Sequence, residues 1–230
     1  MKILIVTTSH ARTGGEGGAG RETGLWMAEL STPYYAFVDA GAVVDIASIA
    51  GGPVPIDPTS MEDEYRLESA ARFLGDAEAM AMLHASRPIE AIPADAYDAI
   101  FLPGGHGTMW DLPTNAALID LIAAMHAAGK VVSAVCHGPA GLVNVTDADG
   151  VPIVRGREVC AFTNSEEEAA GLLHAVPFLL EDRLRELGGL YRSAPDFQAC
   201  AVRDGHLVTG QNPASCPEVS RLVLEAICDG

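Results

Sequence analysis

The sequence is poor in basic residues and has no long hydrophobic run, and each absence excludes a class of partner. Lys and Arg number 14 against 31 Asp and Glu, so the formal net charge over 230 residues is −17. Nucleic acid and anionic membrane surfaces repel such a chain, and we expect neither as a partner. The apolar run at residues 2–7 is too short for a secretory signal and no cleavage site follows it. We therefore expect a cytoplasmic protein.

Cysteine is also sparse, and its pattern argues against a disulfide framework. The five cysteines stand at positions 136, 160, 200, 216 and 228. Their number is odd and they form no C-x-x-C pair. This favours free thiols in a reducing compartment.

Expected strands and helices alternate along the chain, which is typical of an α/β protein whose mostly parallel sheet has helices on both faces. Strands are expected at 2–7, 43–48, 98–102, 131–135 and 158–162, with a hairpin of 198–203 and 206–209. Helices are expected at 24–40 with a break at Pro33, at 115–128, at 166–187 with a break at Pro177, and at 212–228. Residues 1–230 fit one domain. Within it, residues 49–87 differ in composition, because a loop rich in glycine and proline is followed by acidic helical stretches. This segment is predicted to be an inserted lid or interface segment.

The strand at 131–135 leads directly into Cys136. Ala134 and Gly138 give the small-x-nucleophile-x-small spacing of a nucleophile elbow, where the strand and the following helix pass close together. Pro139 suits the first turn of that helix. A helix N-terminus favours a thiolate over a thiol. We therefore predict that Cys136 is a reactive nucleophile rather than a structural cysteine.

A glycine-rich loop, residues 104–107, follows the expected strand at 98–102. The carboxyl ends of parallel strands share one edge of a sheet, so this loop and the elbow are expected to meet. The backbone N–H groups of Gly105 and His137 are predicted to form an oxyanion hole. The His137 side chain could act as base or acid, or pair with a carboxylate. His106 could bind substrate or only reach solvent.

Two stretches of the sequence contain candidate carboxylates for the site. Glu29 lies in the apolar stretch 25–30, where burial would raise its pKa and let it carry a proton near neutral pH. Glu166, Glu167 and Glu168 lie where a helix begins, and acidic residues are favoured there even when solvated. At most one of these three is expected to reach inward.

These residues resemble the ThiJ/PfpI superfamily. The resemblance is carried by Ala134-Val135-Cys136-His137-Gly138-Pro139, by Pro103-Gly104-Gly105-His106-Gly107 and by Glu29-x-x-x-Pro33. Residues 161–167 and 206–215 are similar to its glutathione-independent glyoxalase branch, some members of which are described as heat-shock chaperones. The resemblance implies a flavodoxin-like three-layer sandwich of the class I glutamine amidotransferase-like type, a homodimer and no cofactor.

The resemblance also assigns roles. It implies Cys136 as nucleophile, Glu29 in contact with it, and Glu167 as the acidic partner of His137. The implied activity is that of a lyase of the D-lactate dehydratase type, which converts a small 2-oxoaldehyde (methylglyoxal or glyoxal) to D-lactate or glycolate. Neither His174 nor His206 begins the late His-x-Glu pair that a glutaminase needs.

Two other functions use the same residues. A stress-response chaperone or redox sensor would carry Cys136 as a sulfinic acid beside protonated Glu29. A cysteine peptidase or amidase would need an open cleft at Cys136. No metal site is predicted.

Overall fold

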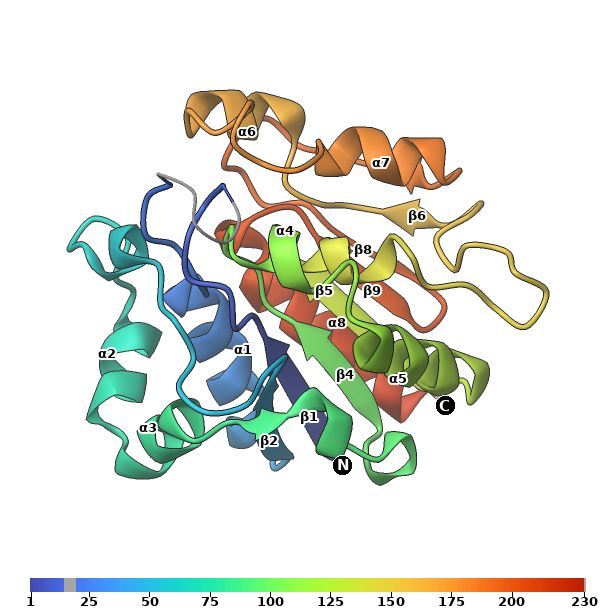
Figure 1. Cartoon of the computed structure of the whole chain (residues 1–230). Helices are drawn as coiled ribbons and strands as arrows, with labels where there is room; N and C mark the ends of the chain where they lie inside the picture. Colours follow the sequence, from blue (N-terminus) through green and yellow to red (C-terminus); the bar gives the residue numbers. More distant parts are fainter. Residues whose placement is uncertain (15–19, 230) are drawn as a thin grey trace.

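The computed structural model describes residues 1–14 and 20–229. Its main sheet is built from β1 (Lys2–Thr7), β2 (Val43–Ser48), β3 (Arg87–Pro88), β4 (Ala99–Leu102), β5 (Val131–Val135), β8 (Ala201–Asp204) and β9 (Leu207–Gly210). The strand order is β3-β2-β1-β4-β5-β9-β8 (Figure 1). Neighbouring strands are parallel, except that β8 runs antiparallel to β9. A second, two-stranded parallel sheet joins β6 (Glu158–Val159) to β7 (Leu190–Tyr191).

Helices cover both faces of the main sheet. The helices are α1 (Met27–Asp39), α2 (Glu68–Gly75), α3 (Ala77–His84), α4 (Thr108–Asp111), α5 (Ala116–Ala127), α6 (Asn164–Ala169), α7 (Leu180–Glu186) and α8 (Cys216–Cys228). Helices α1, α2, α3 and α8 share one apolar cluster with Ile3 and Ile5, whereas α4, α5 and α7 share another with Leu4 and Val6. The alternate side chains of β1 thus enter opposite layers, and the predicted α/β fold is confirmed.

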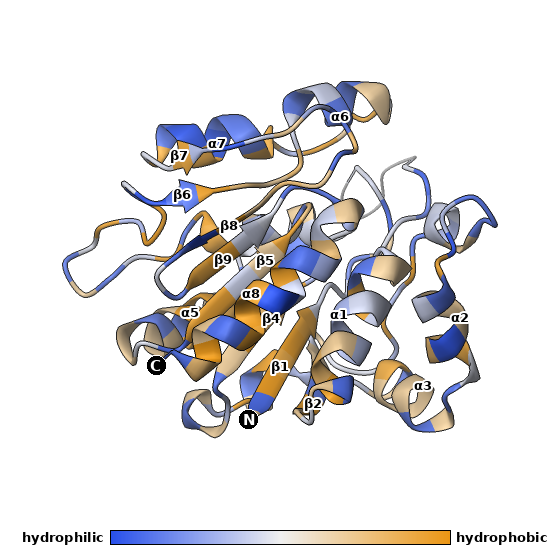
Figure 2. Cartoon of the chain, turned by 180° about the vertical axis from the view of Figure 1, so that it is seen from behind, coloured by the Kyte–Doolittle hydropathy of each residue, from blue (hydrophilic) through white to orange (hydrophobic). Residues whose placement is uncertain are grey.

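The continuous apolar sequence of β1 follows from this burial on both faces. In Figure 2 this strand is hydrophobic along most of its length, whereas α7 shows a mainly hydrophilic surface. The expected strands at 2–7, 43–48 and 131–135 have the predicted bounds, and the hairpin forms around Asp204 and Gly205. Among the described residues, no helix is both long enough and apolar enough to cross a bilayer.

Two local predictions were wrong, and a third was right only in part. Helix α1 runs through Pro33, because buried residues before and after the proline, such as Leu30 and Phe37, keep it packed. The helical stretch expected at 166–187 is interrupted around Pro177 as predicted, but the break is wider and spans residues 170–179, since Gly171 takes a left-handed backbone conformation just after α6 and ends it. The elbow is followed by a single 3₁₀ turn, Gly138–Leu142, rather than an α-helix.

Residues 49–87 lie mostly over the outside of α1. Phe73 of α2 packs edge-on against Tyr34 and Tyr35, and Arg72 forms an ion pair with Asp39. The segment ends in β3, which adds an edge strand beside β2. Its role as a lid or interface stays a prediction.

Candidate active site

Cys136 occupies a sharp turn at the carboxyl end of β5. Its φ is 59°, and only one other non-glycine residue among those described, Phe197, has a positive φ. Such a backbone is costly for a residue with a side chain and is characteristic of functional turns. A Cβ at Gly138 would overlap the carbonyl oxygen of Leu102. The small residue two positions after the nucleophile is therefore a steric requirement.

His137 links the thiol to a carboxylate. Its Nδ1 lies 3.2 Å from the Cys136 Sγ, and its Nε2 lies 2.8 Å from Glu167 Oε2. The second oxygen of Glu167 is 2.8 Å from Nε2 of His106. An ionised carboxylate can only accept, so both imidazoles donate from Nε2 when they are neutral. Nδ1 of His137 then carries a free lone pair directed at the thiol.

The buried histidines and Glu167 determine one another's charge. Burial alone would raise the pKa of Glu167, but attraction to His137 and hydrogen bonds from both rings outweigh it, and the pKa lies well below its usual value. Burial and the neighbouring His137 lower the pKa of His106 to about 4, against the opposing effect of Glu167. His106 is thus neutral at pH 7, and Glu167 is ionised.

Glu29 approaches the thiol from α1. Its Oε2 accepts a hydrogen bond of 2.7 Å from the Gly104 N–H, and the Gly104 carbonyl in turn accepts one from the Trp26 N–H. Its Oε1 is buried and has no hydrogen-bond partner of normal geometry among the described residues. Burial raises the pKa of Glu29 to about 8, although hydrogen bonds to Cys136 and the Gly104 N–H oppose the rise. The carboxyl group is therefore mainly protonated at neutral pH.

Cys136 is a neutral thiol in this arrangement. Burial raises its pKa well above the usual value, and an N–H group of Gly105 directed at the thiol acts in the opposite sense. The expectation that a helix N-terminus would favour the thiolate was wrong, because the short 3₁₀ turn does not outweigh burial. Ionisation of the thiol has to be coupled to proton transfer.

Gly105 is fixed by its surroundings. Its φ is +96°, and a Cβ there would overlap the Gly24 carbonyl oxygen. The glycine brings its N–H close to Cys136. This position fits an oxyanion donor, and its role in a reaction stays a proposal.

The structure brings all the predicted site residues together: Cys136, His137, Glu29, Glu167, Gly105 and His106. Of the two alternatives for His106, the one in which it only reaches solvent is excluded, because the ring is buried against Glu167. Its binding of substrate stays a prediction. One detail differs from expectation. At most one of the three consecutive glutamates was expected to be buried, whereas Glu166 and Glu167 both are.

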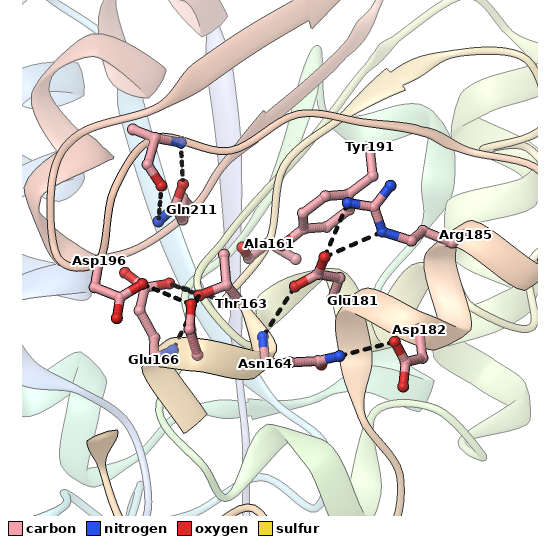
Figure 3. Close-up of polar contacts among 12 residues, drawn as sticks. Ala161, Thr163, Asn164, Glu166, Glu181, Asp182, Arg185, Tyr191, Asp196 and Gln211 are labelled. Atoms are coloured by element: carbon pink, nitrogen blue, oxygen red, sulfur yellow. Dashed lines mark hydrogen bonds and ion pairs between the residues drawn. The ribbon is translucent and has the colours of Figure 1, made fainter. Parts of the chain in front are cut away.

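Glu166 is the residue that sequence reasoning missed. It forms a capping box with Thr163 (Figure 3). Its Oε1 accepts hydrogen bonds from the Phe197 N–H and from Asn212 Nδ2, each at 2.8 Å. These contacts fix the start of α6, and therefore the residue after it, Glu167. The spacing Thr163-x-x-Glu166 is a recognisable capping-box pattern that could have revealed this role.

One group of side chains has the composition of a metal site. Candidate ligand atoms of His106, His137 and Glu167 lie within 4.8 Å of one another. These atoms already satisfy one another as hydrogen-bond partners, and both Nε2 atoms would have to lose their protons to bind an ion. The donor set therefore fits the hydrogen-bonded triad better than a metal, and the absence of a metal cofactor stays a prediction.

Comparison with known proteins bears on the family and the fold of this chain. Residues 23–226 match the model of the DJ-1/PfpI family. A glutathione-independent glyoxalase of Saccharomyces cerevisiae is 30% identical over 98% of both chains. The crystal structure of glyoxalase III from Candida albicans is 26% identical, with a TM-score of 0.89 over 98% of this chain and 97% of the other. The Rapid Encystment Protein of Francisella tularensis is 39% identical, with a TM-score of 0.93 over 98% of each chain.

Proposed function

Because this chain belongs to the DJ-1/PfpI family, we propose that its buried Cys136 site is that of a glutathione-independent glyoxalase. The substrate is a small 2-oxoaldehyde such as methylglyoxal, and the product is the 2-hydroxy acid. One observation carries the proposal: the Glu29 carboxyl group, whose pKa burial raises to about 8, and the Nδ1 atom of His137 flank the same thiol. An acid and a base on either side of a nucleophile are what a proton transfer between adjacent carbons requires.

In the first step the Cys136 sulfur adds to the aldehyde carbon. His137 Nδ1, 3.2 Å away, accepts the thiol proton as the carbon–sulfur bond forms. The N–H groups of Gly105 and His137 stabilise the developing oxyanion. The oxyanion then takes the proton back from His137, and the product is a hemithioacetal.

The second step moves hydrogen between the two substrate carbons. His137 Nδ1 removes the proton from the hemithioacetal carbon while Glu29 donates its proton to the adjacent carbonyl oxygen, which gives an enediol. His137 then gives its proton to the second carbon, and the hydroxyl group on the first carbon gives its proton to the Glu29 carboxylate, which leaves a 2-hydroxy thioester on Cys136. One carbon is oxidised by two electrons and its neighbour is reduced by two, so no external electron acceptor is consumed. Water finally hydrolyses the thioester and regenerates the thiol.

Access to the thiol favours a small substrate. Cys136 is only 4% exposed. Two surface hollows, of about 490 Å³ and about 430 Å³, lie at α7 and around residues 168–175, and neither is lined by Cys136. This gives no support to the peptidase alternative, which needs an open cleft at the nucleophile.

A redox sensor is the second candidate, and the protonated state of Glu29 favours it. A neutral carboxyl group beside Cys136 could donate a hydrogen bond to a sulfinate formed on that sulfur. Such a protein would be oxidised at Cys136 by peroxide but would not turn over dialdehydes.

The decisive assay is D-lactate formation from methylglyoxal by the purified protein, without glutathione or added metal. We expect turnover by the wild type and by Glu168→Gln, a matched control at an exposed position of the same acidic run. Cys136→Ala should abolish turnover and Glu29→Gln should lower it at least a hundredfold. An inactive wild type whose Cys136 still reacts with iodoacetamide would refute the glyoxalase proposal in favour of the sensor, and full activity of Cys136→Ala would refute both.

A further inference from the structure

Two cysteines outside the Cys136 site face each other. The Sγ atoms of Cys160 and Cys200 are 3.2 Å apart, although the residues are 40 positions apart in the sequence. Both are free thiols. A disulfide bond is about 2.05 Å long, so the two sulfurs need to approach by only about 1 Å to form one.

The backbone around each cysteine is anchored, which holds the pair in place. The Cys160 N–H donates to Thr209 Oγ1 at 2.9 Å. The Cys200 N–H donates to Ser215 Oγ at 3.2 Å, and its carbonyl accepts from the Gln211 N–H at 2.9 Å. All three partners lie within residues 209–215, which run from the end of β9 to the start of α8. The two thiols are therefore attached to one rigid region rather than to independent loops.

We infer that Cys160 and Cys200 are a redox-active dithiol, which a low-molecular-weight disulfide oxidises to an intramolecular bond. Cys160 is fully buried, whereas Cys200 is partly exposed, so Cys200 is the thiol that reacts first with the oxidant. Burial also raises the pKa of the Cys160 thiol, which makes it the poorer first nucleophile.

The exchange balances without another reactant. The Cys200 thiolate attacks one sulfur of the small disulfide, forms a mixed disulfide and releases one small thiolate. The Cys160 sulfur then attacks Cys200 Sγ, breaks the mixed disulfide and releases the second small thiolate. The two protein protons end on the two small thiols, so the protein loses two electrons and the small disulfide gains them.

The bond would close the segment that carries Glu167. Residues 160–200 contain α6, β7 and α7, which lie together at one end of the molecule (Figure 2). Internal hydrogen bonds hold this segment together: Asn164 N–H to Glu181 Oε2 at 2.9 Å, Asn164 Nδ2 to Asp182 at 2.8 Å, and the Tyr191 hydroxyl to the Ala161 carbonyl at 2.6 Å (Figure 3). Cys160 and Cys200 stand at its two ends. Oxidation would link the segment that carries Glu167 covalently to the start of β8 in the main sheet.

The test counts thiols in protein equilibrated with glutathione disulfide or with dithiothreitol. After denaturation and alkylation, reduced protein should carry five labels and oxidised protein three, with residues 160 and 200 joined in one peptide. Cys200→Ser should retain four labels in both buffers. Cys228→Ser, a matched control at an exposed cysteine, should lose two labels on oxidation like the wild type. The oxidised wild type should also melt several degrees higher than the reduced protein, because the bond closes a long loop.

Three outcomes would overturn the inference. They are five labelled thiols in the oxidised wild type, a glutathione adduct that stays on Cys200 without closing, or a bond that joins any other pair. Because Cys200 is partly exposed, Cys200→Ser is expected to fold, and its circular dichroism spectrum checks this. Thiol counting is independent of catalysis, so the result stands whether or not the glyoxalase proposal holds.

Discussion

Replacing Glu29 with glutamine should remove a large pH dependence from the stability of this protein. Burial raises the pKa of Glu29 from 4.5 to about 8, so the folded protein keeps a proton that the unfolded chain loses. A raised carboxyl pKa stabilises the fold most fully below pH 4.5, and this contribution falls as the pH rises through about 8. Glutamine is neutral at every pH, and its side-chain carbonyl can still accept a hydrogen bond from the Gly104 N–H.

The size of the effect follows from the pKa difference. One pKa unit corresponds to about 1.4 kcal/mol. Between pH 5 and pH 9 the wild type should lose about 4 kcal/mol relative to Glu29→Gln. Other titrating groups, including His106, are present in both proteins and cancel in the comparison.

Urea unfolding of both proteins at pH 5, 7 and 9, followed by circular dichroism, measures this difference. Glu168→Gln is the matched control, and its difference from the wild type should stay within about 0.5 kcal/mol because the side chain is exposed. A wild-type-to-Glu29→Gln difference that is constant across the range would show that Glu29 is already ionised at pH 5. The reasoning that makes it the proton donor would then be refuted.

The other predictions concern the site and the assembly. Turnover should fall as the pH rises through about 8, where Glu29 loses its proton; a pH–kcat profile that is flat from 7 to 9 would contradict this. Glu167→Gln should lower kcat by about 10²–10⁴-fold with little change in KM, because the amide no longer fixes the tautomer of His137. Gly105→Ala should cost at least about 2 kcal/mol in urea unfolding, since its Cβ would overlap Gly24. Sedimentation should give twice the chain mass if the implied homodimer forms, and a single-chain mass would exclude it.

The parts of this molecule that could be predicted from sequence are those set by local pattern. A run of apolar residues such as 2–7 has to be buried on both sides, so it indicates a central parallel strand. The spacing around Cys136 indicates the elbow, because only small residues fit where the strand and the next turn cross. The strand ends then place Gly105 near the thiol, since parallel strands end at a common edge.

The parts that could not be predicted depend on segments distant in the sequence. Glu166 and Glu167 are consecutive, and both are buried only because Asn212 and the loop at Phe197 cover one while two histidines meet the other. The approach of Cys160 to Cys200 spans 40 residues and has no local signal. Tertiary packing also overrides propensity in α1, which continues through its proline.

The burial of the site also determines the protonation states of Cys136 and Glu29. Burial raises the pKa of the Cys136 thiol and that of the Glu29 carboxyl group, and the nearby Glu166 adds to both rises, so both groups hold their protons. In the proposed mechanism the thiol proton moves to His137 Nδ1, so that the imidazolium forms beside Glu167 and the two charges pair. The mechanism therefore favours the ionised sulfur only while the proton is on His137 and a substrate carbon is present to react with the sulfur. A thiol kept neutral in this way is less readily oxidised than a permanently ionised cysteine.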